Sequence, residues 1–323
     1  MTWHAVVQGC GAYLPAKVLT NADLSKMVDT SDEWIRERTG IRQRHIAADG
    51  ERTSDLAVEA AKAALDNAGI SAKDIDLVIV ATTTPDLVFP ATAAIVQAKL
   101  GVEKGAAFDI QAVCTGFIYA LSTAEKFLTS GQHRHALVIG AETFSRILDW
   151  SDRATCVLFG DGAGAFVMEA LDDSAAEGRG VIATYLRSDG RMVDLLYVDG
   201  GVSATRTVGH VRMQGNKVFR EAIERISEAV VTVCRQAGIE PADIDWVVPH
   251  QANERILQGV VKKLDLDPAH VISTIAGQGN TSAASIPLAY CAGLGDGRIK
   301  KGDLVMLEAM GGGLTWGAAL LRA

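Results

Sequence analysis

Cys114 is the residue of this 323-residue chain whose position best suits covalent chemistry. The strand-like segment 108–113 ends at this cysteine, and a segment rich in small residues follows. We expect a helix to begin there, and the N–H groups and positive dipole end of a helix N-terminus favour thiolate over thiol. Because a thiolate is a nucleophile, this position suggests a covalent intermediate on sulfur. A buried, unreactive cysteine is the alternative interpretation of Cys114 taken alone.

Three further segments carry residues suited to the same chemistry. His250 follows the run 246–249, at the carboxyl end of an expected strand, where α/β sheets usually present active groups. Asn280 lies in the glycine-rich segment 277–285, and glycines let a backbone approach a ligand closely. Gly311–Gly313 allow backbone geometries that can aim an N–H at an oxyanion. Taken alone, each also fits an ordinary role: a surface histidine, a capped turn and a packing turn.

The chain repeats one pattern at an offset of 169 residues. Residues 68–80 read AGISAKDIDLVIV and residues 237–249 read AGIEPADIDWVVP, with seven of thirteen positions identical. Each segment follows a helical pattern that a glycine ends, and the β-branched run after it predicts a buried strand. The apolar runs 137–142 and 304–309 repeat in the same way. Two unrelated helix–strand units also look alike, but the shared A-G-I and D-I-D letters argue for duplication.

We therefore predict two duplicated α/β units, each with strands covered by helices. Ser282 begins the segment that corresponds to the Cys114 helix, so two helix N-termini are expected to meet near the middle of the molecule. That symmetry predicts Asn280 close to Cys114.

The bulk composition excludes several classes of protein. The chain is 48% hydrophobic and 22% charged, enough for a substantial core and against long disordered tracts. Its net charge of −8 argues against a nucleic-acid partner, because proteins that bind nucleic acids carry a basic excess or a basic stripe. Five cysteines without a C-x-x-C pair fit a reducing compartment. No signal peptide or spanning apolar run is visible, so we expect a cytoplasmic protein without a membrane partner.

In several motifs, the chain resembles β-ketoacyl-acyl carrier protein synthase III, a condensing enzyme of the thiolase superfamily. In chain order, the motifs are GCGAYLP (9–15), SDEWI (31–35), RTGI (38–41), FGDGAG (159–164), HQAN (250–253), GNTSAAS (279–285) and GGGLTWG (311–317). The resemblance implies an α/β, thiolase-like fold of five layers, α-β-α-β-α, usually as a homodimer. The two duplicated halves are then residues 1–172, with the nucleophilic cysteine, and residues 173–323, with the histidine and asparagine, packed as one unit.

The resemblance also implies a catalytic triad of Cys114, His250 and Asn280, with an oxyanion hole formed by the N–H groups of Cys114 and Gly312. Elongating synthases have a second histidine where Asn280 stands, and thiolases have a second cysteine. The implied reaction is a ping-pong decarboxylative Claisen condensation, in which an acyl-CoA acylates Cys114 and malonyl-acyl carrier protein then condenses with it. We expect acetyl-CoA as the primer, no metal and no cofactor, since acyl-CoA is a substrate.

Binding roles follow from the same resemblance. Trp34 is expected to stack on the adenine of CoA, with Arg38 and Arg153 beside it, and Phe89 to cap the acyl pocket, often across the dimer interface. A half-buried tryptophan, solvated arginines and a core phenylalanine are the structural alternatives. The carrier-protein contact is expected at Gln251, Ala252, Asn253, Glu254 and above all Arg255, with Lys217, Arg220, Lys262 and Lys263 joining it.

Two other functions stay open on the sequence. One is a synthase III-like polyketide or quinolone-type condensing enzyme or acyltransferase, with the same triad and another donor or acceptor. The other is a non-catalytic acyl-CoA-binding member of the fold, which the three filled triad positions disfavour. Acyl chain length and branching depend on the depth of the pocket and are left open.

Overall fold

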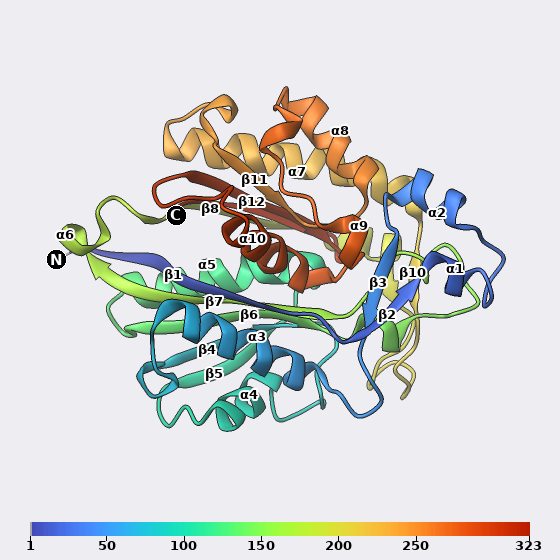
Figure 1. The fold of residues 1–323 in the computed structure, drawn as a ribbon, viewed down its shortest axis with the longest axis horizontal. Helices are drawn as coiled ribbons and strands as arrows, with labels where there is room; N and C mark the ends of the chain where they lie inside the picture. The colour runs from blue at the N-terminus through green and yellow to red at the C-terminus, as the bar shows by residue number, and fades with distance from the viewer. Residues whose placement is uncertain (1) are drawn as a thin grey trace.

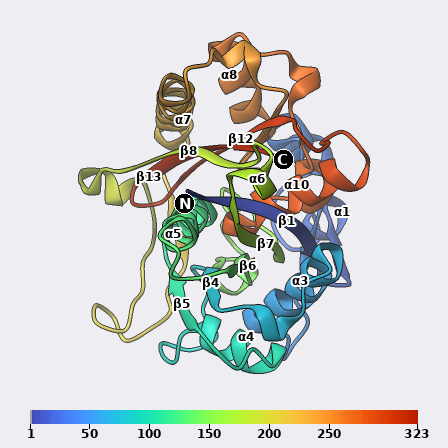
Figure 2. The ribbon, with the colours of Figure 1, turned by 90° about the vertical axis from the view of Figure 1, so that its left-hand side faces the viewer.

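The computed structural model describes residues 2–323 as two stacked sheets with helices outside and between them (Figures 1 and 2). The first sheet has the spatial order β1 (Trp3–Tyr13), β7 (Gly162–Asp172), β6 (His135–Glu142), β4 (Leu77–Ala81) and β5 (Ala106–Ile110). The second has the order β11 (Trp246–Pro249), β12 (Leu304–Gly311), β13 (Thr315–Arg322) and β8 (Gly180–Ser188). In the first sheet β4 pairs in parallel with both β5 and β6, and in the second the edge strand β11 pairs in parallel with β12.

Helices form the remaining three layers. The outer face of the first sheet is covered by α3 (Thr53–Ala68) and α4 (Thr92–Leu100), and that of the second by α7 (Gly215–Ala237) and α8 (Glu254–Leu264). Between the sheets lie α5 (Gly116–Thr129) and α10 (Ser285–Gly295). The predicted five-layer α-β-α-β-α fold is confirmed.

The two halves follow the repeat closely. The 3₁₀ turns η1 (Ala72–Asp74) and η5 (Pro241–Asp243) are 169 residues apart, and so are the first residues of β6 and β12. The same offset relates the 3₁₀ turns η2 (Val113–Thr115) and η7 (Ser282–Ala284), which lead into α5 and α10. The predicted meeting of two helix N-termini is therefore present at the centre of the molecule.

The central helix α10 has no charged side chain on any face because it lies between the two sheets. In α10, the buried side chains include Ile286, Leu288, Ala289 and Tyr290. A helix without a polar face is stable only when it is enclosed in this way. Tyr290 tilts against Phe166 of β7 with ring centroids 4.7 Å apart, which joins α10 to the first sheet. One hydrophobic core thus runs through both halves.

A smaller set of elements covers the edge of the molecule where the parallel strands end (Figure 1). Buried Arg44 holds them together: its guanidinium donates to Asn21 Oδ1 at 2.9 Å, to the Leu19 carbonyl at 3.1 Å and to the Val157 carbonyl at 2.7 Å. Burial lowers the pKa of Arg44 to about 10. These covering elements are α1 (Asn21–Leu24), α2 (Asp32–Thr39), β2 (Lys17–Thr20), β3 (Gln43–Ile46), η3 (Phe144–Ile147), β9 (Leu196–Val198), β10 (Val211–Met213) and α9 (Ile275–Gln278).

Elsewhere, α6 (Asp173–Ala176), η4 (Gly190–Leu195) and η6 (Pro268–His270) complete the connections.

Gly140 of β6 sets how closely the two halves approach. A Cβ at this position would lie 2.3 Å from the Ala283 carbonyl oxygen, a backbone atom of η7 that has no freedom to swing away. We predict that Gly140→Ala lowers the free energy of unfolding by about 1–3 kcal/mol, the usual effect of overpacking. Gly295→Ala, where a Cβ meets nothing within 4 Å, is the control and should change stability little. Equal thermal unfolding midpoints for the two variants would contradict this interpretation.

Candidate active site

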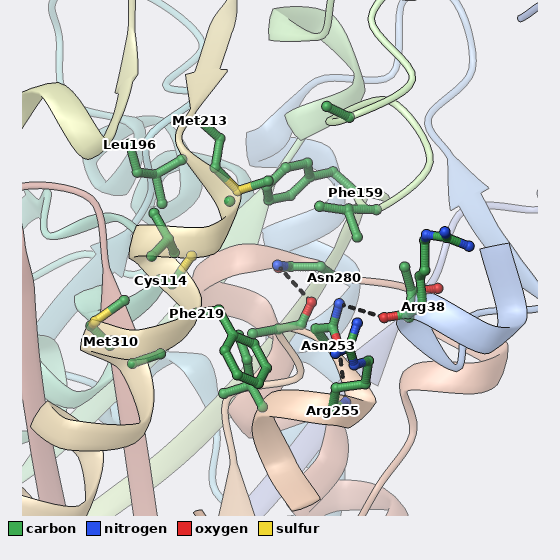
Figure 3. Close-up of a pocket in the computed structure, with 18 of the residues that line it drawn as sticks. Arg38, Cys114, Phe159, Leu196, Met213, Phe219, Asn253, Arg255, Asn280 and Met310 are labelled. Atoms are coloured by element: carbon green, nitrogen blue, oxygen red, sulfur yellow. Dashed lines mark hydrogen bonds between the residues drawn. The ribbon is translucent and has the colours of Figure 1, made fainter. Parts of the chain in front are cut away.

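One cavity of about 390 Å³ is lined by the three candidate catalytic residues, and Figure 3 shows Cys114 and Asn280 in it. Cys114 comes from η2 in the first half, whereas His250 follows β11 and Asn280 precedes η7 in the second half. The three residues are at most 5% exposed. The structure thus brings together side chains that are up to 166 positions apart in the chain (114 to 280), and the duplicated halves are what makes this possible.

Cys114 is a thiol at rest. Burial raises the pKa of its thiol to about 12, against the opposing effect of a hydrogen bond from Ser282. The sequence-based expectation that a helix N-terminus favours the thiolate is therefore corrected, because desolvation of the anion is the largest influence on this pKa and favours the thiol. The turn that presents the sulfur is unusual: Val113, just before it, has a left-handed φ of 50°. β-branched residues rarely adopt this conformation.

The imidazole of His250 is neutral and its tautomer follows from its partners. Burial lowers its pKa to about 3. Its Nδ1 lies 2.7 Å from Ser285 Oγ, which itself accepts the Gln251 N–H at 3.2 Å. Among the described residues, the buried Ser285 hydroxyl has no other hydrogen-bond acceptor for its own proton, so it donates to Nδ1 and the imidazole proton sits on Nε2. His250 therefore presents an N–H donor to the cavity.

Asn280 is oriented by a hydrogen bond to its own turn. Its Oδ1 accepts the Ser282 N–H at 2.9 Å, which directs Nδ2 away from that turn and toward the cavity. Nδ2 lies 3.4 Å from the Ala252 carbonyl, so one amide proton is weakly engaged and the other is available to a ligand (Figure 3). An amide keeps this donor at any working pH. The site therefore holds two neutral donors opposite a thiol.

The glycine turn 311–313 packs directly on the nucleophile. A Cβ at Gly311 would lie 2.7 Å from the Cys114 nitrogen, so only glycine fits. Thr315, after the turn, donates from Oγ1 to the Ala112 carbonyl at 3.0 Å. Gly312 lies beside the Val113 side chain. These contacts hold the backbone of Gly312 next to the residue that carries the sulfur.

The cavity opens beside a tryptophan with two arginines over its ring. The Arg38 and Arg153 guanidinium carbons lie 4.5 Å and 5.2 Å from the ring centroid of half-buried Trp34. Asn253 caps the N-terminus of α8 and also donates from Nδ2 to the Arg38 carbonyl at 3.0 Å (Figure 3). The mouth thus combines a flat apolar surface with positive charge, and α8 supports it.

The segment 251–255 runs from buried Gln251 through half-buried Ala252, Asn253 and Glu254 to exposed Arg255. Gln251 is fully buried, where its amide donates to the Pro249 and Ile272 carbonyls and accepts the Thr274 N–H at 2.7 Å. This corrects its assignment to a surface contact, because its polar atoms are already paired inside the protein. Arg255 is exposed at the mouth, with its guanidinium 5.6 Å from the Phe219 ring centroid.

Phe89 does not line the cavity of its own chain. It is 83% exposed, on the connection between β4 and α4, beside the exposed Leu87 and Val88. Large apolar side chains gathered on a surface mark an interaction site. The expected role of Phe89 in a partner's acyl pocket therefore stays a prediction.

Sequence reasoning missed three residues that act on the triad. Ser285 orients His250, and Ser282 contacts both Asn280 and Cys114. Glu142, fully buried at the end of β6, accepts a hydrogen bond from Ser282 Oγ at 3.2 Å. The one available signal was a charged residue that ends an apolar strand, and nothing in a sequence says what that residue contacts.

Over residues 2–323, the structure contains no cluster of three potential metal-ligating side chains. Within the same residues, no helix is both long and apolar enough to cross a bilayer.

Comparison with known proteins identifies the family. Residues 108–190 match the family model of 3-oxoacyl-[acyl-carrier-protein] synthase III, and residues 234–323 match the model of its C-terminal part. β-Ketoacyl-[acyl-carrier-protein] synthase III of Rhodospirillum centenum is 61% identical over 322 residues, covering 100% of both chains.

Solved structures agree with the sequence relatives. The crystal structure of 3-oxoacyl-[acyl-carrier-protein] synthase III from Aquifex aeolicus VF5 matches 99% of this chain and 100% of its own, with a TM-score of 0.94 and 46% identity. The priming β-ketosynthase of the R1128 polyketide pathway matches with a TM-score of 0.93 and 33% identity, covering 99% of this chain and 97% of its own. The chain therefore belongs to the β-ketoacyl-[acyl-carrier-protein] synthase III family.

Proposed function

We propose that this protein is a β-ketoacyl-acyl carrier protein synthase III that condenses an acyl-CoA primer, acetyl-CoA first, with malonyl-acyl carrier protein to initiate fatty acid synthesis. The observation that carries the proposal is the single cavity in which a buried thiol faces two neutral hydrogen-bond donors, His250 and Asn280. Full-length relatives at about 60% identity bear the same name.

The first half-reaction transfers the acyl group to sulfur. Cys114 attacks the thioester carbonyl, and the charge that develops on oxygen is stabilised by the N–H groups of Cys114 and Gly312. The bond to CoA then breaks and CoA leaves. The close contact between Gly311 and the Cys114 nitrogen supports this assignment, because it places the turn that carries the Gly312 N–H against the turn that carries the Cys114 N–H.

The second half-reaction needs donors for an enolate. When malonyl-acyl carrier protein loses CO₂, the electrons of the broken C–C bond form an enolate whose charge lies on the thioester oxygen. His250 Nε2–H and Asn280 Nδ2–H are placed to donate to that oxygen. Both groups are neutral, so neither stabilises the malonyl carboxylate by charge and thereby opposes its loss as CO₂. The carbanion then attacks the acyl carbon on Cys114, and no metal is required to create it.

The substrates enter from the mouth. We assign the adenine of CoA to a stack on Trp34, with Arg38 and Arg153 for ring and phosphates, because a guanidinium suits both. The acidic carrier protein is assigned to Arg255, with exposed Lys217, Arg220 and Lys262 around it. Lys263 pairs with Glu224, so its charge is partly neutralised.

The assembly and location belong to the same proposal. We infer a cytoplasmic homodimer whose interface includes the exposed 87–89 segment, with the partner's Phe89 closing the acyl pocket.

A polyketide-type priming synthase is the second candidate. The observation in its favour is the 33% identical priming β-ketosynthase, whose fold matches this chain over 99% of its length. It would share the chemistry of Cys114 and differ in the acyl donor or the carrier protein. The lower identity makes it the weaker candidate.

Mass spectrometry of the intact protein after exposure to a panel of acyl-CoAs tests the function directly. We expect an acyl adduct on Cys114, formed fastest with acetyl-CoA, and its loss as acetoacetyl-carrier protein when malonyl-acyl carrier protein is added. An adduct only with other donors would favour the second candidate. No adduct with any acyl-CoA would contradict a condensing function.

Two variants separate the half-reactions. Cys114→Ala should abolish acyl transfer while it still decarboxylates malonyl-acyl carrier protein. His250→Ala should still accept an acyl group but lose decarboxylation by roughly 10²–10³-fold, the usual effect of removing one oxyanion donor. Acylation is followed by mass spectrometry, and decarboxylation by CO₂ release. Equal loss of both half-reactions in both variants would sink this division of roles.

Charge reversal at the mouth tests the carrier-protein assignment. Arg255→Glu should lower kcat/KM for malonyl-acyl carrier protein roughly tenfold at low salt, with a smaller difference at high salt, because such charges mainly raise the association rate. Lys300→Glu is the control, because it makes the same change of charge at a residue that precedes β12. Steady-state kinetics at two salt concentrations gives the comparison, and the assignment fails if the two variants behave alike.

A further inference from the structure

Glu142 is a buried carboxyl group one hydroxyl away from the nucleophile. It ends β6 and is 0% exposed. The Thr83 N–H donates to both of its oxygens at 3.1 Å, and Thr84 Oγ1 donates to Oε2 at 2.6 Å. On its other side, Ser282 Oγ donates to Oε1 at 3.2 Å. The two half-reactions described above give none of these groups a task.

Ser282 links this carboxyl group to the sulfur. The Cys114 side chain lies within reach of this hydroxyl, whose donation to a thiolate acts to lower the pKa of that thiol. With the sulfur protonated, Oγ gives its one proton to Glu142 and can accept from the Cys114 S–H. Ser282 has a left-handed φ of 50°, at the position that corresponds to Val113 in the other half. Residues other than glycine rarely adopt this conformation. The strained turn thus puts one hydroxyl between Cys114 Sγ and Glu142 Oε1.

The nucleophile needs a proton acceptor that His250 does not supply. Cys114 is a thiol at rest, so its proton must leave when sulfur attacks the acyl carbon. The Nε2 of His250 already carries a proton, and its Nδ1 is occupied by the Ser285 hydroxyl. Burial holds the pKa of this imidazole near 3, so it takes up a second proton poorly.

Glu142 has the properties of the missing acceptor. Its Oε2 accepts hydrogen bonds from Thr82, Thr83 and Thr84, whereas Oε1 accepts from Ser282 and shares the Thr83 N–H. A proton that arrives on Oε1 can therefore be donated back to the Ser282 hydroxyl. The groups that face Glu142 from the end of β4 and from η7 are hydroxyls and a backbone amide, and Cys114 is the titratable group across Ser282. Burial raises the pKa of Glu142 to about 7, so both the carboxylate and the protonated carboxyl group are accessible near neutral pH.

We propose that Glu142 receives the proton of Cys114 through the Ser282 hydroxyl when the nucleophile is acylated. This step rests on the proposed function, because it belongs to the first half-reaction. Glu142 acts through Ser282 and does not touch the substrate, so it is a positioning and proton-holding residue for Cys114.

The atoms balance over the cycle. The S–H bond breaks, Ser282 Oγ takes that proton and passes its own to Glu142 Oε1, and the sulfur electron pair forms the bond to the acyl carbon. The C–S bond to CoA breaks, and the departing thiolate takes a proton from solvent. When condensation later breaks the bond between the acyl carbon and Cys114, the sulfur leaves as a thiolate and regains its proton along the same path.

This path also suits the second half-reaction. While sulfur carries the acyl group, the carboxyl group of Glu142 is neutral. No fixed negative charge then opposes the enolate that forms beside His250 and Asn280. The proton consumed overall is the one that CoA takes from solvent, as a decarboxylating condensation requires.

Alkylation of Cys114 by iodoacetamide tests the proton path without any acyl substrate. We expect the wild-type rate to rise with pH through about 7, as Glu142 becomes a carboxylate, and Glu142→Gln to be at least tenfold slower at pH 8. Ser282→Ala should show the same loss, and the double variant should be no slower than either single variant. His250, with its pKa near 3, does not titrate in this range.

The opposite sign would overturn the proposal. If Glu142 acts on Cys114 only through its charge, Glu142→Gln removes a carboxylate that raises the pKa of the thiol, and alkylation becomes faster. Glu308→Gln is the matched control: Glu308 is also buried, with a pKa raised to about 8 by burial, and is expected to leave the rate unchanged.

Folding and function are checked in parallel. Thermal unfolding midpoints identify a variant that fails to fold, and Ser282→Ala then decides the question if Glu142→Gln is unstable. Acylation of the same proteins by acetyl-CoA is measured by mass spectrometry. If acyl-CoA does not acylate the wild-type protein but the variants show the predicted alkylation rates, the proposed function is contradicted and the proton path is supported. Normal acylation with unchanged alkylation in both variants contradicts the proton path alone.

Discussion

The close backbone contact between the two halves is the constraint on which the site depends. Gly140 of β6 admits the Ala283 carbonyl, and Gly311 of β12 admits the Cys114 nitrogen, so each half touches the turn that begins the central helix of the other. Gly140 lies two residues before the end of β6, and Gly311 is the last residue of β12. A side chain at either position would separate η2 from η7, and with them Cys114 from Asn280. The apolar faces of α5 and α10 pack on both sides of this contact and stabilise it.

Burial at this contact sets the electrostatics of the site. The same desolvation raises the pKa of Cys114 to about 12 and of Glu142 to about 7, and lowers that of His250 to about 3. A thiol and a neutral imidazole are therefore favoured over a thiolate–imidazolium pair. A site of this kind does not store a reactive anion. It creates one only when a substrate carbonyl is present to accept the electron pair, and the proton must then have a defined destination.

Much of the fold was predictable because duplication leaves a periodic trace. The 169-residue offset predicted two units and a central meeting of helix N-termini, and the 3₁₀ turns η1 and η5 obey it. The position of Cys114 before a helix was predicted from the local pattern, an apolar run followed by small residues. Its protonation state was predicted wrongly, because the helix dipole is visible in a sequence pattern and the depth of burial is not. Gln251 shows the same limit: it stands in a polar motif beside the exposed Arg255, yet its side chain turns inward.

The residues that sequence reasoning missed share a physical cause. Ser282, Ser285 and Glu142 act through hydrogen bonds to groups that are distant in sequence, and each belongs to a residue type that is common in turns or on surfaces. Ser285 determines which nitrogen of His250 carries the proton, although it lies 35 positions away. Ser282 combines a strained backbone with two partners from the other half. The duplicated fold brings the two turns together, but the groups on them differ: at the repeat offset Cys114 corresponds to Ala283 and Asn280 to Gln111, and the hydroxyls of Ser282 and Ser285 also belong to one half alone. Chemistry at the centre of this molecule therefore depends on where the two halves differ as much as on where they repeat.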